Sequence, residues 1–151
     1  SSDSLANERF RNWVSHLLSH HQKLAKRLVF QISETVIVEH LESTRLFINA
    51  VHKVGARVIL DCQQSSDALE LTDHVKSLTI DMVKVSGPEN QPIVDAQKSS
   101  GFIKTLVSNA HDINVPVIAG QVENSQVWEF LNTLGIDAGQ GHLFGRPVIF
   151  T

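Results

Sequence analysis

The sequence predicts an α/β fold in which parallel strands alternate with helices. Apolar runs that end in polar residues near positions 34, 61, 85 and 119 are separated by segments whose apolar residues recur at helical spacing. This alternation is typical of parallel strands joined by crossover helices. The 151 residues suffice for one domain with a core, and 42% hydrophobic against 19% charged residues excludes a disordered chain.

The first half of the chain predicts two helices and two strands. The apolar run 28–32 indicates a buried strand that ends at Ser33 and Glu34. A second strand over 57–60 closes at Asp61, after a helix that stops at Gly55. The first helix is predicted by apolar residues at helical spacing: Phe10, Trp13, Val14, Leu17 and Leu24. The helix before Gly55 is predicted in the same way by Leu41, Ile48 and Val51.

The second half continues the pattern. The polar segment 63–67 leads into a helix that ends near Leu78, and the breaker-rich stretch 87–92 is a loop. The strongest helical stripe follows this loop: Phe102, Ile103, Leu106, Val107, Ala110 and Ile113. The other expected elements are strands over 80–85, 115–119 and 136–138, a helix capped by Asn124 or Ser125 and ended by Gly135, and an extended piece over 147–150.

Two architectures fit this order of elements: a doubly wound open parallel sheet and a (β/α)8 barrel. A complete barrel needs roughly 200 to 250 residues or more. On length alone, the chain therefore favours the open sheet.

Composition excludes several classes of protein. Thirteen basic against sixteen acidic residues give a formal charge of −3, which argues against binding to a nucleic-acid polymer. The lone Cys62 excludes a disulfide framework and fits a reducing compartment. No apolar run approaches the ~20 residues of a membrane span, and the first residues lack the features of a signal peptide. We therefore expect a cytoplasmic domain without membrane contact of its own.

The candidate site lies where the strands end, because ligands collect beyond the carboxyl ends of parallel strands in both architectures. The polar residues at these ends are Ser33, Glu34, Asp61, Lys84, Glu123 and Gln140. Such a group could hold a divalent metal and a phosphate, or its acids and amides could simply cap the following helices. Lys84 lies within an apolar strand, where a buried ammonium must be paired, unless the strand is a solvated edge.

Other reactive residue types give weaker signals. His16 and His20 share a helix face, but no third ligand stands beside them, so we interpret them as solvated. His142 follows a Gln-Gly turn and is expected at the surface. Cys62 is expected to be a buried, inert thiol. The sequence contains no Gly-rich dinucleotide motif, no Walker phosphate loop and no His-Glu-x-x-His motif.

Several segments together resemble the EAL domain family in order and spacing. They are 28–34 (LVFQISE), 60–61 (LD), 80–85 (IDMVKV), 117–124 (VIAGQVEN) and 140–147 (QGHLFGRP), the last being close to the family's Gln-Gly-Tyr-x-Phe-x-x-Pro signature. EAL domains are (β/α)8-type barrels that hydrolyse the bacterial second messenger cyclic di-GMP with two divalent cations. The resemblance therefore implies that residues 1–151 are a partial domain, an incomplete barrel that lacks its opening strands and the Glu-Ala-Leu strand. Ser1 and Ser4-Leu5 resemble the stretch that follows the family's metal-binding asparagine.

The resemblance also implies roles for retained residues. Lys84, Gln140 and Glu34 stand at catalytic positions, of which Glu34 steadies an active-site loop. Asp61, Glu123 and Gln140 stand at ligand-binding positions, and Asp61 is the retained metal position.

Three family acids are replaced in this chain, by Gln31, Cys62 and Gly120. Two-metal hydrolysis needs several anionic oxygens to hold both cations and to activate water. A hard cation finds no good oxygen ligand in cysteine, and glycine offers no side chain. We therefore expect at least one metal position to be empty and the machinery to be vestigial, with no cofactor in this chain and Mg²⁺ or Mn²⁺ only if the whole protein is active.

The resemblance, together with these replacements, implies a degenerate EAL domain that acts as a cyclic di-GMP receptor or as a protein-interaction module. The alternatives are an active phosphodiesterase in the full-length protein and a purely structural dimerisation module. The expected partners are cyclic di-GMP, a second copy or another protein, and an upstream GGDEF domain. The whole protein could still be membrane-anchored through other segments.

Overall fold

Five parallel strands form one sheet in the order of the sequence, β1-β2-β3-β4-β5. The computed structural model describes residues 7–63, 67–87 and 100–146. The strands are β1 (Val29–Ser33), β2 (Arg57–Gln63), β3 (Met82–Ser86), β4 (Val117–Ala119) and β5 (Ala138–Gly139). Strands β1 to β4 overlap the predicted apolar runs, whereas β5 shares only Ala138 with the strand predicted over 136–138. The extended piece expected over 147–150 lies outside the described residues.

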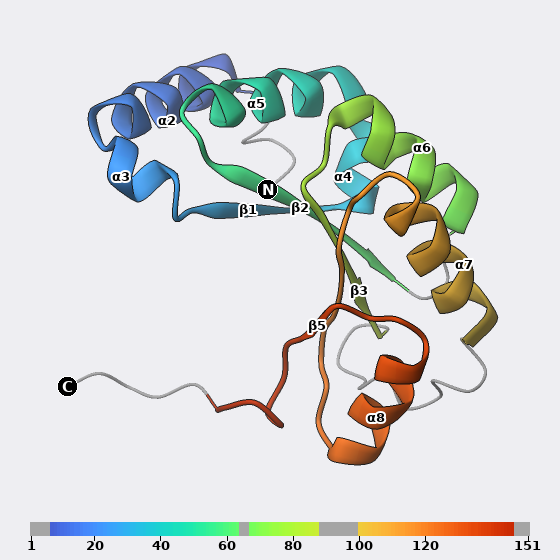
Figure 1. Cartoon of the computed structure of the whole chain (residues 1–151). Helices are drawn as coiled ribbons and strands as arrows, with labels where there is room; N and C mark the ends of the chain where they lie inside the picture. The colour runs from blue at the N-terminus through green and yellow to red at the C-terminus, as the bar shows by residue number, and fades with distance from the viewer. Residues whose placement is uncertain (1–6, 64–66, 88–99, 147–151) are drawn as a thin grey trace.

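The helices lie along one side of this sheet, as Figure 1 shows for α2, α5, α6 and α7. Their bounds are α2 (Glu8–His20), α3 (Gln22–Ala25), α4 (Glu34–Glu39), α5 (Leu41–Lys53), α6 (Ala68–Leu78), α7 (Ser100–His111) and α8 (Ser125–Thr133). A doubly wound sheet has helices on both faces and reverses its strand order at a switch point. Sequential parallel strands with an outer helix layer form the wall of a (β/α)8 barrel. The observed architecture is therefore the expected incomplete barrel and not the doubly wound open sheet.

The hydrophobic core lies between the sheet and the helices. Along β2 the burial alternates, with Val58, Leu60 and Cys62 buried and the residues between them partly or fully exposed. Because side chains alternate across a strand, the buried set faces the helices and the other set faces the concave side. The largest fully buried side chains are Ile37, Ile48, Leu60, Leu71, Leu78, Ile103, Leu106 and Leu131.

Two local elements differ from the sequence prediction. The first helix is interrupted at His21, whose φ of −127° and ψ of 49° are not helical, so α2 and α3 are separate. A short helix, α4, follows β1 directly, where no helix is predicted from the sequence. Four of its six residues are Thr, Val or Ile, which favour strands, so packing decides this conformation.

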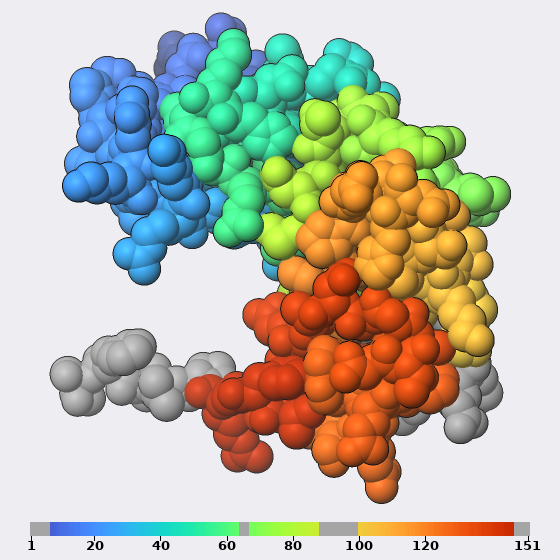
Figure 2. All heavy atoms as spheres, viewed as in Figure 1, coloured from blue at the N-terminus to red at the C-terminus, as the bar shows by residue number. Residues whose placement is uncertain are grey.

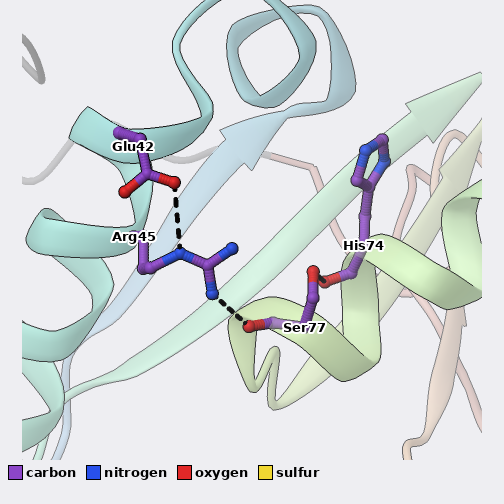
Figure 3. A network of polar contacts seen from close by, with 4 residues as sticks. All are labelled: Glu42, Arg45, His74 and Ser77. Carbon is purple, nitrogen blue, oxygen red and sulfur yellow. Dashed lines mark hydrogen bonds and ion pairs between the residues drawn. The ribbon is translucent and has the colours of Figure 1, made fainter.

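Polar contacts fix the helix ends. Asn124 accepts a hydrogen bond from the Val127 N–H and caps α8, as one of the two predicted alternatives. On the outer surface, Arg45 of α5 donates from Nη1 to the Ser77 carbonyl near the end of α6, at 2.7 Å (Figure 3). The Arg45 Nε also lies 3.6 Å from Glu42 Oε1. This arginine therefore joins neighbouring helices by satisfying a free helix-end carbonyl.

Among the described residues, the inner side of the sheet is partly exposed to solvent, and the inward-facing side chains of β3 are half-buried. Figure 2 shows a hollow between the N-terminal helices and the C-terminal part of the described chain. Among the described residues, β1 pairs only with β2, and β5 pairs only with β4. No helix in the described part is long and apolar enough to cross a membrane.

Candidate functional site

Four polar side chains lie on the concave side of the sheet near the carboxyl ends of β1, β2 and β3. Strand register places Asp61 beside both Ser33 and Lys84. Gln31 lies two residues before Ser33, and Ser86 lies two residues after Lys84, so both keep the same face of their strands. We call Gln31, Asp61, Lys84 and Ser86 the Asp61 cluster.

Hydrogen bonds from neutral groups hold the Asp61 carboxylate. Gln31 donates from Nε2 to Asp61 Oδ2 at 2.6 Å, and Ser86 donates from Oγ to Asp61 Oδ1 at 3.2 Å. Lys84 donates from Nζ to Gln31 Oε1 at a longer distance of 3.4 Å. Both carboxylate oxygens therefore have donors, and the Gln31 amide lies between the anion and the ammonium.

Gly120 makes room for this arrangement. It follows β4, is buried, and donates its N–H to the Val85 carbonyl at 2.8 Å. A Cβ atom at Gly120 would lie 2.6 Å from Ser86 Oγ and 2.8 Å from Lys84 Cε. The side chains of β3 thus occupy the space into which any residue larger than glycine would extend.

The Asp61 cluster does not fit a two-metal centre. Among the described residues, no group of three or more His, Cys, Asp or Glu side chains could hold a metal ion. Within the cluster, Asp61 is the sole carboxylate, and its partners Gln31 and Ser86 are neutral. Two divalent cations together need many oxygen ligands, and a single carboxylate supplies few of them.

Cys62 lies on the opposite face of β2, and its side chain is 1% exposed. Burial, followed by the negative charges of Glu34 and Asp61, raises the pKa of the Cys62 thiol far above its usual range. The thiol therefore remains neutral, as expected for an inert residue, and does not face the Asp61 cluster. Glu34 is half-buried at the start of α4.

The loops after β4 and β5 form a second polar region, which we call the β4–β5 rim (residues 120–124 and 140–144). His142 Nδ1 lies 2.8 Å from Glu123 Oε2. The Gln140 backbone N–H donates to the Ala119 carbonyl at 2.8 Å, and its side chain is exposed. In the described part of the chain, no hydrogen bond joins the side chain of Glu123 or Gln140 to the Asp61 cluster.

The structure thus divides the candidate residues into two groups. Asp61 and Lys84 come together as strand ends, and Gln31 and Gly120 lie beside them. Glu123 and Gln140 belong to the β4–β5 rim instead. Sequence reasoning missed Ser86, although its spacing of two residues from Lys84 could have indicated it. It also missed the pairing of His142 with Glu123, for which the sequence offers no periodic signal.

Comparison with known proteins gives a consistent picture. The sequence model of the EAL domain matches residues 1–147. The cyclic di-GMP phosphodiesterase PdeF of Escherichia coli (strain K12) is 26% identical over 147 residues, which cover 97% of this chain and 19% of that protein. The chain therefore spans about a fifth of the length of this relative.

Solved structures share the fold. The S helix-GGDEF-EAL structure of Vibrio cholerae LapD bound to c-di-GMP has a TM-score of 0.81 and 25% identity, covering 95% of this chain and 35% of that one. The FimX EAL domain from Pseudomonas aeruginosa bound to c-di-GMP has a TM-score of 0.75 and 22% identity, covering 94% of this chain and 57% of that one.

Proposed function

Because the chain belongs to the EAL domain family, we propose that it is part of a domain that binds cyclic di-GMP without hydrolysing it. In this proposal the domain is a receptor in a bacterial signalling protein. The observation that carries it is the Asp61 cluster, in which a single carboxylate is held by neutral donors, whereas metal-dependent hydrolysis needs several carboxylates.

The loss of hydrolysis follows from charge. Gln31 and Gly120 contribute no anionic oxygen, and the neutral Cys62 thiol faces the helices. Asp61 alone supplies too few anionic oxygens to hold two cations. Without both cations, the pKa of the attacking water is not lowered as two-metal hydrolysis requires. We therefore propose that the domain works without Mg²⁺ or Mn²⁺, and that the family positions Lys84, Glu34 and Gln140 serve binding rather than turnover.

Lys84 supplies the attraction for the nucleotide. Among the described residues its ammonium forms no ion pair with a carboxylate, and its one polar contact there is the long bond to Gln31. The side chain is partly exposed on the concave side of the sheet. An ammonium in this state can form a charge-assisted hydrogen bond to a phosphodiester oxygen. The similar structure of LapD bound to c-di-GMP supports this choice of ligand.

The wider setting is also a proposal. The GGDEF and EAL domains of the similar LapD structure support an upstream GGDEF domain in the whole protein. The lone buried thiol suits a reducing compartment, so we place the domain in the cytoplasm. A second copy or another protein would receive the signal.

A calorimetric titration of cyclic di-GMP into the protein with a chelator present tests this proposal. We expect saturable binding without metal, and we expect Lys84→Gln to weaken it about 10- to 100-fold, because a hydrogen bond to a charged group is lost. Lys104→Gln is the matched control, since Lys104 is an exposed lysine of α7 outside the site. It should bind like the wild type.

The same protein should then be incubated with cyclic di-GMP and Mn²⁺ or Mg²⁺, and the products separated by chromatography. Unchanged nucleotide supports the receptor. Linear product that accumulates with enzyme concentration would show an active phosphodiesterase and overturn the proposal. Absence of any heat of binding would overturn it in favour of an interaction or dimerisation module.

A further inference from the structure

Positive charge is concentrated in one region of this mildly acidic chain. Residues 9–33 and 43–60 contain none of the sixteen Asp and Glu residues. They form most of α2 and α5, all of α3 and β1, and the start of β2. The same two segments hold eight of the thirteen basic residues, namely Arg9, Arg11, Lys23, Lys26, Arg27, Arg45, Lys53 and Arg57. A region of this composition attracts anions even though the whole chain carries a formal charge of −3.

The acids between the two segments lie away from the region's amino end. Glu34 and Glu39 belong to α4, which follows the carboxyl end of β1. Glu42 lies in the first turn of α5, whereas Lys53 is the last residue of this 13-residue helix. The end of α5 and the segment that leads into β1 are therefore the most positive part of the region.

A cleft of about 300 Å³ lies between these two parts. The end of α2, the short helix α3 and the end of α5 line it with Ser19, Gln22, Lys26, His52, Lys53 and Gly55. Because α3 leads into β1 and α5 leads into β2, the cleft lies at the amino ends of these strands (Figure 1). The Asp61 cluster lies near their carboxyl ends, so the two sites are separate.

Two lysines from different segments meet in this cleft. The stem of Lys26 lies over Gly55, where a Cβ atom would be 3.1 Å from Lys26 Cγ and where a φ of +86° also favours glycine. Lys53 complements the dipole of α5, but this dipole does not account for Lys26. Neither ammonium forms an ion pair with a carboxylate among the described residues. The two like charges repel each other, and an anion between them would remove this repulsion.

The other groups of the cleft carry no negative charge. Gln22 is exposed and has an amide N–H₂ that can donate to a ligand. His52 Nε2 lies 2.9 Å from the Asp81 carboxylate, which also accepts the Val58 N–H, so this acid is already paired.

A second cleft of the chain gives an internal comparison. It lies between α6 and α7, has a similar volume of about 280 Å³, and is lined by charges of both signs, from Asp73, Lys76 and Asp112. Its lysine thus has acids close by, whereas Lys26 and Lys53 do not. The excess of positive charge therefore distinguishes the cleft between α3 and α5.

We propose that the cleft between α3 and the end of α5 binds a phosphate group, which Lys26 and Lys53 hold by charge and to which Gln22 donates a hydrogen bond. Lysine ammonium groups bind phosphate as compact point charges. Arg57 adds to the attracting field, since its N–H donates to the Leu28 carbonyl at 3.1 Å beside the cleft. The volume suits a small phosphorylated ligand or a lipid headgroup, which share this chemistry. This site is independent of nucleotide binding at the Asp61 cluster.

Calorimetric titration of inorganic pyrophosphate into the 151-residue chain at low ionic strength tests the proposal. We expect saturable binding that weakens as salt is added. Lys26→Gln and Lys53→Gln should each weaken it about three- to tenfold, because each removes one charge-assisted hydrogen bond at an exposed position. Both side chains are exposed, so neither substitution should unfold the protein. Absence of saturable binding would overturn the proposal.

Two further lysines are matched controls. Lys23→Gln removes the same charge from α3 at a residue that does not line the cleft, and Lys76→Gln removes it from the cleft between α6 and α7. Both variants should bind pyrophosphate within about twofold of the wild type. Equal losses in Lys23→Gln and Lys26→Gln would show a diffuse field without a site. A loss in Lys84→Gln with none in Lys26→Gln would move the anion to the Asp61 cluster and equally reject the proposal.

The source of the phosphate is tested with vesicles of phosphatidylcholine that contain phosphatidic acid, whose headgroup is a phosphate monoester. Vesicle binding that is lost in Lys26→Gln and Lys53→Gln would support the cleft as a lipid headgroup site. Pyrophosphate binding without vesicle binding would support it as a site for a soluble phosphorylated ligand. Neither measurement uses cyclic di-GMP, so failure here leaves the proposed receptor untouched, and failure of the receptor leaves this cleft untouched.

Discussion

Gly120 and Gly141 show how single residues set the geometry of the site. At Gly120 a Cβ atom would meet the ends of two flexible side chains, Ser86 Oγ and Lys84 Cε. At Gly141 it would meet the backbone of Val122, which cannot rotate away. Side-chain ends can move at low cost, whereas displaced backbone costs typically 1–3 kcal/mol or more. The two glycines should therefore respond differently to the same methyl group.

We expect Gly120→Ala to change the free energy of unfolding by less than about 1 kcal/mol, since the lost freedom of the unfolded chain offsets the local crowding. The same change should weaken cyclic di-GMP binding, because Lys84 must move. Gly141→Ala should destabilise the protein by about 1–3 kcal/mol. Urea unfolding and calorimetry measure the two effects.

Gly101 of α7 is the matched control, since a Cβ atom there has no neighbour within 4 Å. Gly101→Ala should raise stability by up to about 1 kcal/mol through helix propensity and leave binding unchanged. Equal losses of stability at positions 120 and 141 would contradict this account of the site.

Among the elements, α7, β4 and β5 are tied together by a carboxylate at the amino end of the sheet. Asp137 accepts the Val117 N–H at 2.7 Å, returns its own N–H to the Val117 carbonyl at 3.0 Å, and lies 2.9 Å from His111 Nε2. Asp81 makes the equivalent contacts with Val58 and His52 between α5, β2 and β3. The same arrangement thus fixes two strand pairs at the end away from the site, where barrels keep stabilising residues.

This geometry predicts a pH-dependent contribution to stability. Burial opposes ionisation of Asp137, but hydrogen bonds from His111 and the Val117 N–H, with the nearby imidazole charge, hold its pKa below the usual range. A carboxyl whose pKa is lowered on folding stabilises the folded state at pH values above its unfolded-state pKa of about 4. This contribution is lost as the pH falls through the pKa of the carboxyl in the folded state. Because the carboxylate is 39% exposed, we expect Asp137→Asn to cost only about 0.5–1 kcal/mol at pH 7.

Urea unfolding at pH 7, 5 and 3 measures this difference, which should shrink toward the acid end. Asp112→Asn is the control, because the exposed Asp112 side chain forms no ion pair in the described residues. A difference between wild type and Asp137→Asn that stayed constant with pH would exclude the charge as its source.

The elements also show which features the sequence could predict. Strands β2 and β3 were predictable, because short apolar runs end at Asp61 and after Lys84, and parallel register then brings these ends together. Helix α4 was not predictable from the sequence, because its β-branched residues favour a strand and only packing makes them helical. The contact of His142 with Glu123 depends on two loops and on Gly141, so no local pattern could indicate it.

At the scale of the whole molecule, the five-stranded sheet has two free edges among the described residues. Apolar side chains are exposed near the first edge, with Trp13 59%, Leu17 42%, Leu24 53% and Val29 39% accessible. An unpaired strand beside apolar surface is a template for association. The described part of the barrel wall therefore lacks a neighbour along β1, and a second copy can supply one.

We expect the 151-residue chain to associate as its concentration rises, which sedimentation velocity would record as a growing sedimentation coefficient. Val29→Lys places a charge on β1 and should shift the chain toward monomer, because a lysine on an edge strand opposes pairing. Leu69→Lys is the control, since Leu69 is 66% exposed on α6 of the outer helix layer. It should associate like the wild type. A single monomeric species at every concentration, or equal effects of both substitutions, would show that the β1 edge does not drive association.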